Sequence, residues 1–507
     1  MHAHWVRDSL LGHTVRLFDK PSWLTYPEEN SYGGEAIDEN PVPFHDDTGI
    51  RVDWYSADDK ENPHNWPQGR KAFVLGVIGA YSFVVYMAAA IYTPSEGDFA
   101  EEFEVGEAEA SLGLSLYVLG YGAGPMFFSP LSEIPRIGRN LPYVMSFVLY
   151  CAVSIPTALA PSAISFHFLR FLQGFFGSPC LATGGASIAD MYSSRCYLTQ
   201  WQPGCFLGWR FSMWEILIAS APVLILLLLL PETSSATILH RRARRLARRD
   251  KAGTRKYWTK ADVLQGDTSF SVVVRESLLI PSRITLLDPA ILFLNCYTSL
   301  TYGIFYSFFE AFPIVYQDIY GFNLGEMGLA FLAIVVGSII SFAIYNLYYI
   351  HHRRNAPSTA QNQDQENSTP ASDHEKVLVP ALYACIGPPL ALLLFGWASR
   401  PTIHWIVPTI GIAIYPACVF ILMQCVFLYV PACYPHYAAS VFAATDFTRS
   451  AFACGAVMFS RPLYVHLGVG VGCSILAGLT VVCAVGVHWL YRFGEALRRR
   501  SRFEEKV

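Results

Sequence analysis

The sequence has few charged residues. Only 15% of its 507 residues are Asp, Glu, Lys or Arg, whereas soluble domains usually carry about 25%. Hydrophobic residues make up 53% of the chain, aromatic residues 14%, and the mean hydropathy is +0.32. These proportions exclude a disordered chain and most soluble enzyme folds. The net charge of -4 at pH 7 gives no indication of nucleic-acid binding.

Cysteine pairs and nucleotide motifs are also missing. None of the 12 cysteines lies in a CxxC pair, and most lie in apolar stretches, where small side chains pack well. No GxxxxGK[ST] loop, nucleophile elbow or metal-ligand spacing is present. The sequence therefore predicts a protein that is not an enzyme and has no metal, no cofactor and no ATP partner.

Long apolar blocks are what the sequence has instead. Each is about 20 residues or longer, enough for a helix to cross a bilayer core about 30 Å thick. We therefore predict an all-α, multi-pass membrane protein. Eleven blocks are recognisable, at 71–92, 111–131, 141–160, 163–189, 212–230, 286–309, 325–349, 377–397, 402–430, 437–459 and 466–491.

Polar stretches divide the chain into parts. We expect a polar cytosolic N-terminal tail, because the first 70 residues are charged, are broken by Pro and Gly, and do not resemble a cleavable signal peptide. The Arg-rich run from Arg241 to Arg249 is expected in a cytosolic loop, either solvated or in contact with anionic lipid head groups. The predicted parts are the tail at 1–70, a membrane half at 71–230, a basic central loop at 231–285, a second membrane half at 286–492 with a disordered loop at 351–376, and a cytosolic tail at 493–507.

The positions of Lys and Arg set the expected orientation. Short cytosolic loops retain these residues, which places Arg136, Arg139 and the Arg241 cluster in the cytosol with both termini. That arrangement requires an even number of spans, but eleven are recognisable. The conflict lies between Asp190 and Arg210, where Pro203 and Gly204 interrupt a stretch too short to cross as a helix. We therefore predict that one span is missing near 191–211.

Several motifs, in order along the chain, resemble the fungal drug/proton antiporter branch of the major facilitator superfamily, whose members have twelve spans. The resemblance covers nearly the whole chain from Glu61. The motifs are Glu61-Asn-Pro-His-Asn-Trp-Pro67, Gly124-Pro-Met-Phe-Phe-Ser-Pro-Leu-Ser-Glu-Ile-Pro-Arg-Ile-Gly-Arg139, Arg170-Phe-Leu-Gln-Gly-Phe-Phe-Gly-Ser-Pro179, Trp209-Arg-Phe-Ser-Met-Trp-Glu215 and Leu230-Pro-Glu-Thr233.

The resemblance implies a major facilitator fold of two pseudo-symmetric helical bundles that expose a central cavity alternately to either side. It also implies proton-driven export of a small amphipathic organic compound, by a pump that works as a single chain in the plasma membrane. An importer or polyamine/nutrient transporter of the same fold is an alternative, because fold does not fix function. The family places a fifth span where this chain has 194–207, which suggests a gene-model error or a lesion in the gene. A truncated product that does not transport is therefore a second alternative.

The second motif is similar to the family's cytosolic gate. Gly124 and Pro125 permit close helix approach and a bend. Glu133, Arg136 and Arg139 are expected to form a charged latch around Gly138 in the loop that follows. An ordinary positive-inside loop is the alternative.

Two further positions stand out because charges inside a membrane are costly. Arg170, with Gln173, lies near the middle of an apolar block, and the family's equivalent arginine is implicated in proton coupling. The alternative is an arginine that braces neighbouring carbonyls. Glu310, at the end of the 286–309 block, is expected either to titrate and attract cationic substrates or to be a boundary residue.

The remaining candidates are assigned to structure or to packing. Glu215, Asp446 and Arg449 are expected to form structural ion pairs at span ends. Six aromatic residues form a cluster that either lines a substrate cavity or packs the core. They are Tyr297, Tyr302, Phe305, Tyr306, Phe308 and Phe309. Lipid and a small organic molecule are the expected partners.

Overall fold

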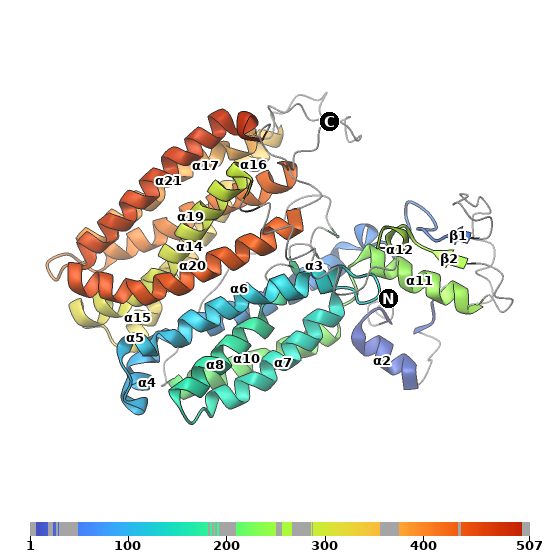
Figure 1. Ribbon diagram of the computed structural model, residues 1–507, viewed down its shortest axis with the longest axis horizontal. Coiled ribbons are helices and arrows are strands. Elements are labelled where there is room, and N and C mark those ends of the chain that lie inside the picture. Colours follow the sequence, from blue (N-terminus) through green and yellow to red (C-terminus); the bar gives the residue numbers. More distant parts are fainter. Residues whose placement is uncertain are drawn as a thin grey trace.

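The structure is a computed structural model that is almost entirely helical (Figure 1). It describes residues 7–18, 24–26, 29, 49–180, 183–184, 187, 190–191, 209–249, 256–265, 285, 287–354, 375–433 and 438–498. The predicted all-α class is confirmed. Of the loop predicted at 351–376, residues 351–354 instead continue helix α16 (Leu332–Arg354) and 375–376 belong to the short helix η9 (Glu375–Leu378). The rest of that loop (355–374), most of the C-terminal tail and the stretch at 192–208 lie outside the described residues.

The N-terminal half is a bundle of long helices. Pro67 precedes the first of them, and Ser162 caps another through a reciprocal bond with Ser165. Two short helices, α4 (Glu96–Phe103) and α5 (Glu107–Ala110), connect the first two long ones. The long helices are α3 (Gln68–Ala90), α6 (Leu112–Glu133), α7 (Asn140–Ala158), α8 (Ala163–Gly177) and α10 (Trp209–Leu228).

The C-terminal half is a second bundle that lies beside the first (Figure 1). Asp288 caps its first helix, whose first residue is Pro289, a position where a missing N–H costs nothing. Its helices are α14 (Pro289–Phe312), the π-helix η6 (Pro313–Ile319), α15 (Leu324–Ala330), α16 (Leu332–Arg354), α17 (Val379–Ala384), α18 (Gly387–Ala398), α19 (Ile406–Cys433), α20 (Ala438–Leu467) and α21 (Val469–Arg498).

Apolar side chains cover the outside of both bundles. Ile164, Leu347 and Val482, for example, are 80%, 67% and 69% exposed, as expected of side chains that face lipid. Seven helical stretches of the described chain are long and apolar enough to cross a membrane. The other predicted spans are α6, α8, α14 and α20, and the last three carry the buried charged residues Arg170, Glu310 and Asp446.

The two ends of the bundle differ in chemistry. One end, the basic end, carries Arg139 and α11 (Ser235–Arg249), which meet at Glu232. The opposite end, the far end, carries Glu102 and the end of α7. Arg210, at the start of α10, bonds there to Glu102 and to the carbonyl of Ala158. Since the charge pattern predicts a cytosolic basic end, the far end is the predicted outer side.

The chain changes ends between α8 and α10. Asp190 pairs with Arg139 at the basic end, with 2.9 Å between Arg139 Nε and Asp190 Oδ2. Trp209, only 19 positions later, donates its ring N–H to Glu102 at the far end. Two successive described segments therefore lie at opposite ends of the bundle. This is the place where the sequence predicts the missing span.

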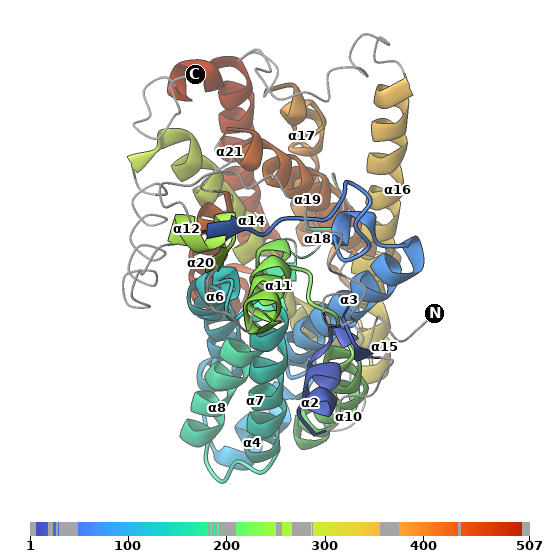
Figure 2. The same ribbon diagram turned by 90° about the vertical axis from the view of Figure 1, so that its right-hand side faces the viewer.

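The N-terminal tail and the central loop fold together. Strand β1 (Gly49–Arg51) pairs in parallel with β2 (Lys256–Trp258), with Ile50 opposite Tyr257. Helix α2 (Leu10–Phe18) lies beside α11 (Figures 1 and 2). We call this unit, the described residues of 7–66 and 231–265, the clasp.

A buried arginine holds the clasp together. Arg242 of α11 is completely buried and bonds to Asp59 at 2.9 Å and to Glu61 at 2.8 Å. Arg7 reaches the other oxygen of Glu61 at 2.8 Å. Neither alternative given for the Arg241 cluster, lipid contact or solvation, accounts for Arg242, which instead joins two parts of the chain that the sequence analysis treated as separate.

Candidate functional site

Arg170 is buried about two turns into α8, nearer the far end than the mid-span position expected from the sequence. Its Nε donates to the carbonyl of Gly113 at 3.0 Å, and its Nη atoms donate to the carbonyls of Ala88 at 3.0 Å and Ala89 at 3.4 Å. Ala88 and Ala89 are in the last turn of α3, where carbonyls lack helical partners. Arg170 therefore closes the end of α3 and joins it to the start of α6.

Gln173 extends this network to a third helix. Its side-chain oxygen accepts a bond from Arg170 at 3.0 Å, and its amide donates to Ser154 of α7 at 2.7 Å. The guanidinium of Arg170 also lies 4.4 Å from the ring centre of Tyr117. This geometry matches the alternative in which the arginine braces carbonyls.

Glu310 lies in a buried carboxylate pair at the far end. Ser111 Oγ is 3.1 Å from Oε2 of Glu96 and 3.3 Å from Oε2 of Glu310. Glu96 and Glu310 are only 8% and 1% exposed, so Glu310 is not a boundary residue. Glu96, from α4, was missed by the sequence analysis. The only feature of the local sequence that marks Glu96 is its position directly after an apolar block. Many solvated carboxylates occupy such a position.

Further contacts join the two halves. Arg461 of α20 bonds to both carboxylate oxygens of Glu107, at 2.7 and 2.8 Å. The hydroxyl of Tyr121 in α6 contacts those of Tyr302 and Tyr306 in α14. A Cβ at Gly122 would lie 2.2 Å from Cβ of Ser450, so glycine is what lets α6 lie directly on α20. The halves are thus in contact in the middle and at the far end.

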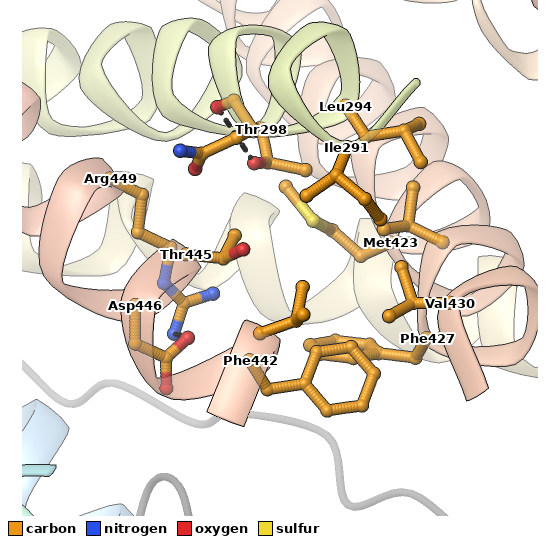
Figure 3. Close-up of a pocket in the computed structure, with 13 residues that line it drawn as sticks. Ile291, Leu294, Thr298, Met423, Phe427, Val430, Phe442, Thr445, Asp446 and Arg449 are labelled. Carbon is orange, nitrogen blue, oxygen red and sulfur yellow. Dashed lines mark hydrogen bonds and ion pairs between the residues drawn. The ribbon is translucent and has the colours of Figure 1, made fainter. Parts of the chain in front are cut away.

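A small pocket lies nearer the basic end, between α14, α19 and α20 (Figure 3). Asp446 and Arg449, 3.0 Å apart, form one side, with Asn295, Thr298 and Thr445 nearby. Met423, Phe427 and Val430 line the opposite side. The lining is therefore polar on one side and apolar on the other.

The predicted aromatic cluster packs the core instead. Phe308 makes edge contacts with Phe395 and Tyr415, and Phe309 stacks on Phe331. None of the six aromatic residues named from the sequence lines the described pocket. Glu215, half-buried in α10, has no hydrogen bond or ion pair within the described part of the chain.

The gate motif lies at the basic end, where Arg139 interacts electrostatically with Glu133 and also pairs with carboxylates from outside the motif. Arg139 pairs with Asp190, and its backbone N–H donates to Glu232 at 3.1 Å. Glu232 is completely buried and also accepts from the backbone of Asn140 at 3.4 Å. Glu133 and Arg136 lie at exposed positions of the same turn. The sequence analysis did not assign Asp190 or Glu232 to the gate.

The glycines and the proline of the gate motif position these helices. Gly138 has a φ of +77°, which an L side chain rarely adopts, and allows the turn to reach Glu232. A Cβ at Gly124 would lie 2.5 Å from the carbonyl of Phe175, so this glycine brings α6 against α8. Pro125 is buried next to it within α6.

Burial raises the pKa of Asp190 to about 6, although Arg139 opposes the rise and Glu232 adds to it.

Two helical bundles with a membrane-facing apolar surface, charged groups buried between them and a pocket inside one half define a multi-pass membrane transporter. The sequence profile of the Major Facilitator Superfamily matches residues 78–195 and 204–458. The chain belongs to this superfamily, a family of transporters rather than enzymes, as the sequence motifs indicated. The break between the two matched parts falls within the stretch where the missing span is predicted.

Similar fungal proteins cover most of the chain. It is 43% identical to the MFS-type transporter pyvG of Aspergillus violaceofuscus, over 90% of this chain and 85% of that protein. It is 37% identical to the fluconazole resistance protein 1 of Saccharomyces cerevisiae, over 94% and 88% of the two chains. It is 36% identical to the cycloheximide resistance protein of Candida maltosa, over 94% and 89%.

Solved structures share the fold at low sequence identity. The crystal structure of the human organic anion transporter MFSD10 (TETRAN) aligns with a TM-score of 0.52 and 14% identity, covering 83% of this chain and 100% of that one. The nucleoside transporter NupG aligns with a TM-score of 0.51 and 12% identity, covering 83% and 99%. The predicted major facilitator fold is therefore confirmed.

Proposed function

We propose that this protein is a proton-coupled efflux pump for small amphipathic organic compounds. The observation that carries the proposal is the similarity, over about nine tenths of the chain, to fungal transporters named for resistance to fluconazole and to cycloheximide. The pocket, with Asp446 and Arg449 on one side and apolar residues on the other, supports a substrate of mixed polarity. A proton gradient is the proposed energy source, and a single chain in the plasma membrane is the proposed working form.

The proposal assigns Glu310 to proton binding and Arg170 with Gln173 to coupling. Glu310 is a buried carboxylate between the halves, where its charge depends on how they are arranged. Arg170 and Gln173 join α3, α6 and α7, so they transmit a change at the far end to three helices. The assignment of Arg170 fails if Arg170→Ala, at wild-type protein level, keeps full proton-dependent export.

An export assay tests the function. Yeast cells without their own drug pumps are expected to become more resistant to fluconazole or cycloheximide when they express this chain, and a protonophore is expected to abolish the difference. Increased sensitivity, or growth on a nutrient that the host cannot otherwise take up, would instead support an importer. The fold does not decide between the two, since a nucleoside transporter shares it.

A truncated product is the second candidate, because only residues 192–208 connect the basic end at Asp190 to the far end at Trp209. A full-length messenger read across the codons for 190–210 tests it directly. About 20 additional apolar codons would restore the even number of spans and support the pump. A messenger that matches this sequence, with protein retained in the endoplasmic reticulum and no substrate flux, would support the truncated product.

A further inference from the structure

The far end holds two buried carboxylates that no cation neutralises. Within the described residues, neither Glu96 nor Glu310 forms an ion pair, and Oε1 of each is buried without a hydrogen-bond partner. Their Oε2 atoms lie at 3.1 and 3.3 Å from the same oxygen, Ser111 Oγ. A serine hydroxyl has one hydrogen and can donate it to only one of them.

The neighbouring charged and polar groups do not satisfy the second carboxylate, because each of them is already bonded elsewhere. Arg461 is bonded to both oxygens of Glu107, and Arg170 is bonded to the carbonyls of Ala88, Ala89 and Gly113 and to Gln173. The hydroxyls of Tyr92 and Tyr464, which also face this region, are bonded to Ala110 and Ser307. Two like charges in one buried site repel each other strongly, so the arrangement is stable only when one of the carboxyls carries a proton.

We propose that Glu96 and Glu310 form one proton site shared between the two halves, and that its occupation allows the far end to close. Glu96 and Ser111 belong to the N-terminal half and Glu310 to α14 of the C-terminal half, so the site is complete only when the halves meet. One proton from the far side forms an O–H bond with one carboxylate oxygen, no other covalent bond changes, and Ser111 then donates its hydrogen to the other carboxylate. This inference rests on the proposed proton coupling, and it adds Glu96 to Glu310 as the second carboxylate that binds the proton.

The coupling follows from the energy difference between the two arrangements. When the far end opens, each carboxylate gains water and loses the repulsion of the other, so it binds a proton less tightly. Closing without a proton buries two like charges, and closing with one proton buries a single charge that has a donor. Low pH on the far side therefore favours closing there, which is the direction required for proton entry in exchange for exported substrate.

Distances between spin labels can measure this closing. Labels at Ile164 and Val465, exposed at the far end of the N- and C-terminal halves, are placed in a full-length chain whose native cysteines are replaced. As pH falls from 9 to 5, the wild-type background is expected to shift from long to short distances. The Glu96→Gln/Glu310→Gln double variant, permanently neutral, is expected to give the short distance at every pH. A double variant with the wild-type pH response would overturn the proposal.

A second variant keeps both carboxyls and so avoids the risk that the double variant misfolds. Ser111→Ala removes the donor that stabilises an ionised carboxylate. The closed state with one proton then loses its donor, so the closing midpoint is expected to move to lower pH, and an unchanged midpoint contradicts the shared site. Glu102→Gln is the matched control, because Glu102 lies at the same end but bonds only within the N-terminal half, to Trp209 and Arg210. It is expected to keep the wild-type response.

Transport in proteoliposomes separates this inference from the proposed function. With cycloheximide as the probe, the double variant is expected to exchange the compound across the membrane but to lose accumulation driven by a pH gradient. Accumulation that persists in the double variant counts against the shared site alone. If the wild-type chain moves no probe at all, the efflux function fails, while the label distances still decide whether the pair binds a proton.

Discussion

Arg170 shows how a charged side chain is stabilised inside a helical membrane protein. Its guanidinium bonds to three backbone carbonyls and one amide oxygen, rather than to a carboxylate. Two of the carbonyls belong to the end of α3, where they have no helical partner. The arginine and the helix end therefore satisfy each other, which makes Arg170 a structural requirement as well as a proposed coupling residue.

Replacing this side chain tests the structural requirement. Arg170→Met keeps much of the volume but leaves the carbonyls of Ala88, Ala89 and Gly113 without a donor. Since hydrogen bonds to charged groups contribute about 1.5–3 kcal/mol each, we expect a stability loss of at least about 3 kcal/mol. The thermal unfolding midpoint in detergent would report it. Arg400→Met, at an exposed arginine, is the control, and equal midpoints for the two variants would refute the requirement.

His13 provides a pH-sensitive contact in the clasp. Burial lowers its pKa to about 4, and the nearby Arg241 adds to the effect, with Nη1 of Arg241 3.1 Å from Nε2 of His13. Because the folded-state pKa lies below the ordinary value of about 6.5, the neutral ring stabilises the clasp above pH 6.5. This contribution is lost as pH falls from about 6.5 to about 4.

We therefore expect acid to loosen the clasp in the wild type more than in His13→Gln. Hydrogen exchange of the α2 amides between pH 7 and 4.5, corrected for the intrinsic pH dependence of exchange, measures the difference. His64→Gln, at an exposed histidine of the same unit, serves as the control and is expected to behave as the wild type. Identical pH profiles for the wild type and His13→Gln would show that His13 does not act in this way.

At the scale of elements, α11 contributes one buried arginine among several exposed ones. Removing Arg242 leaves Asp59 and Glu61 partly without their partner, and breaking a buried pair in this way costs about 3–5 kcal/mol. Arg242→Ala is thus expected to expose the N-terminal tail to protease while the membrane helices stay protected. Arg244→Ala, on the exposed side of the same helix, is expected to change neither. Equal cleavage rates in the two variants would contradict the central role of Arg242.

The helices could be predicted from the sequence much better than their contacts. Apolar blocks locate α3, α7 and the other long helices because a bilayer requires about 20 apolar residues for each span. The clasp could not be predicted, since Arg242 and Asp59 are 183 positions apart and polar segments carry no periodic signal. Short motifs indicated the region of the gate, but Asp190 and Glu232, which bind Arg139, come from loop positions elsewhere in the chain.

The proton site shows the same limit. Glu310 was a candidate because a carboxylate next to an apolar block is unusual. Its relation to Ser111, 199 positions away, depends on how the two halves meet and on no local pattern. The sequence singled out Arg170, but which of the two roles the residue has depends on the carbonyls around it, which only the packing of α3, α6 and α8 shows.

At the scale of the whole molecule, Glu107 and Arg461 join the halves at the far end. The pair is partly exposed, so we expect it to contribute only about 0.2–1 kcal/mol. Glu107→Arg is expected to shift the spin-label distances toward the open far end by up to about fivefold in population, as that energy implies. Glu107→Arg/Arg461→Glu should restore the wild-type distribution. A double variant that stays as open as the single one would show that the pair does not act as a tie.

The order in which the ribosome makes the chain determines when the clasp can form. Asp59 and Glu61 leave the ribosome about 180 residues before Arg242, which at about 5–20 residues per second means a wait of roughly 10–40 seconds. During this time the helices of the N-terminal half are made and inserted while Asp59 and Glu61 still lack Arg242. The clasp therefore forms only after the N-terminal half is complete. Its assembly marks the point at which the nascent chain has delivered its central loop to the correct side of the membrane.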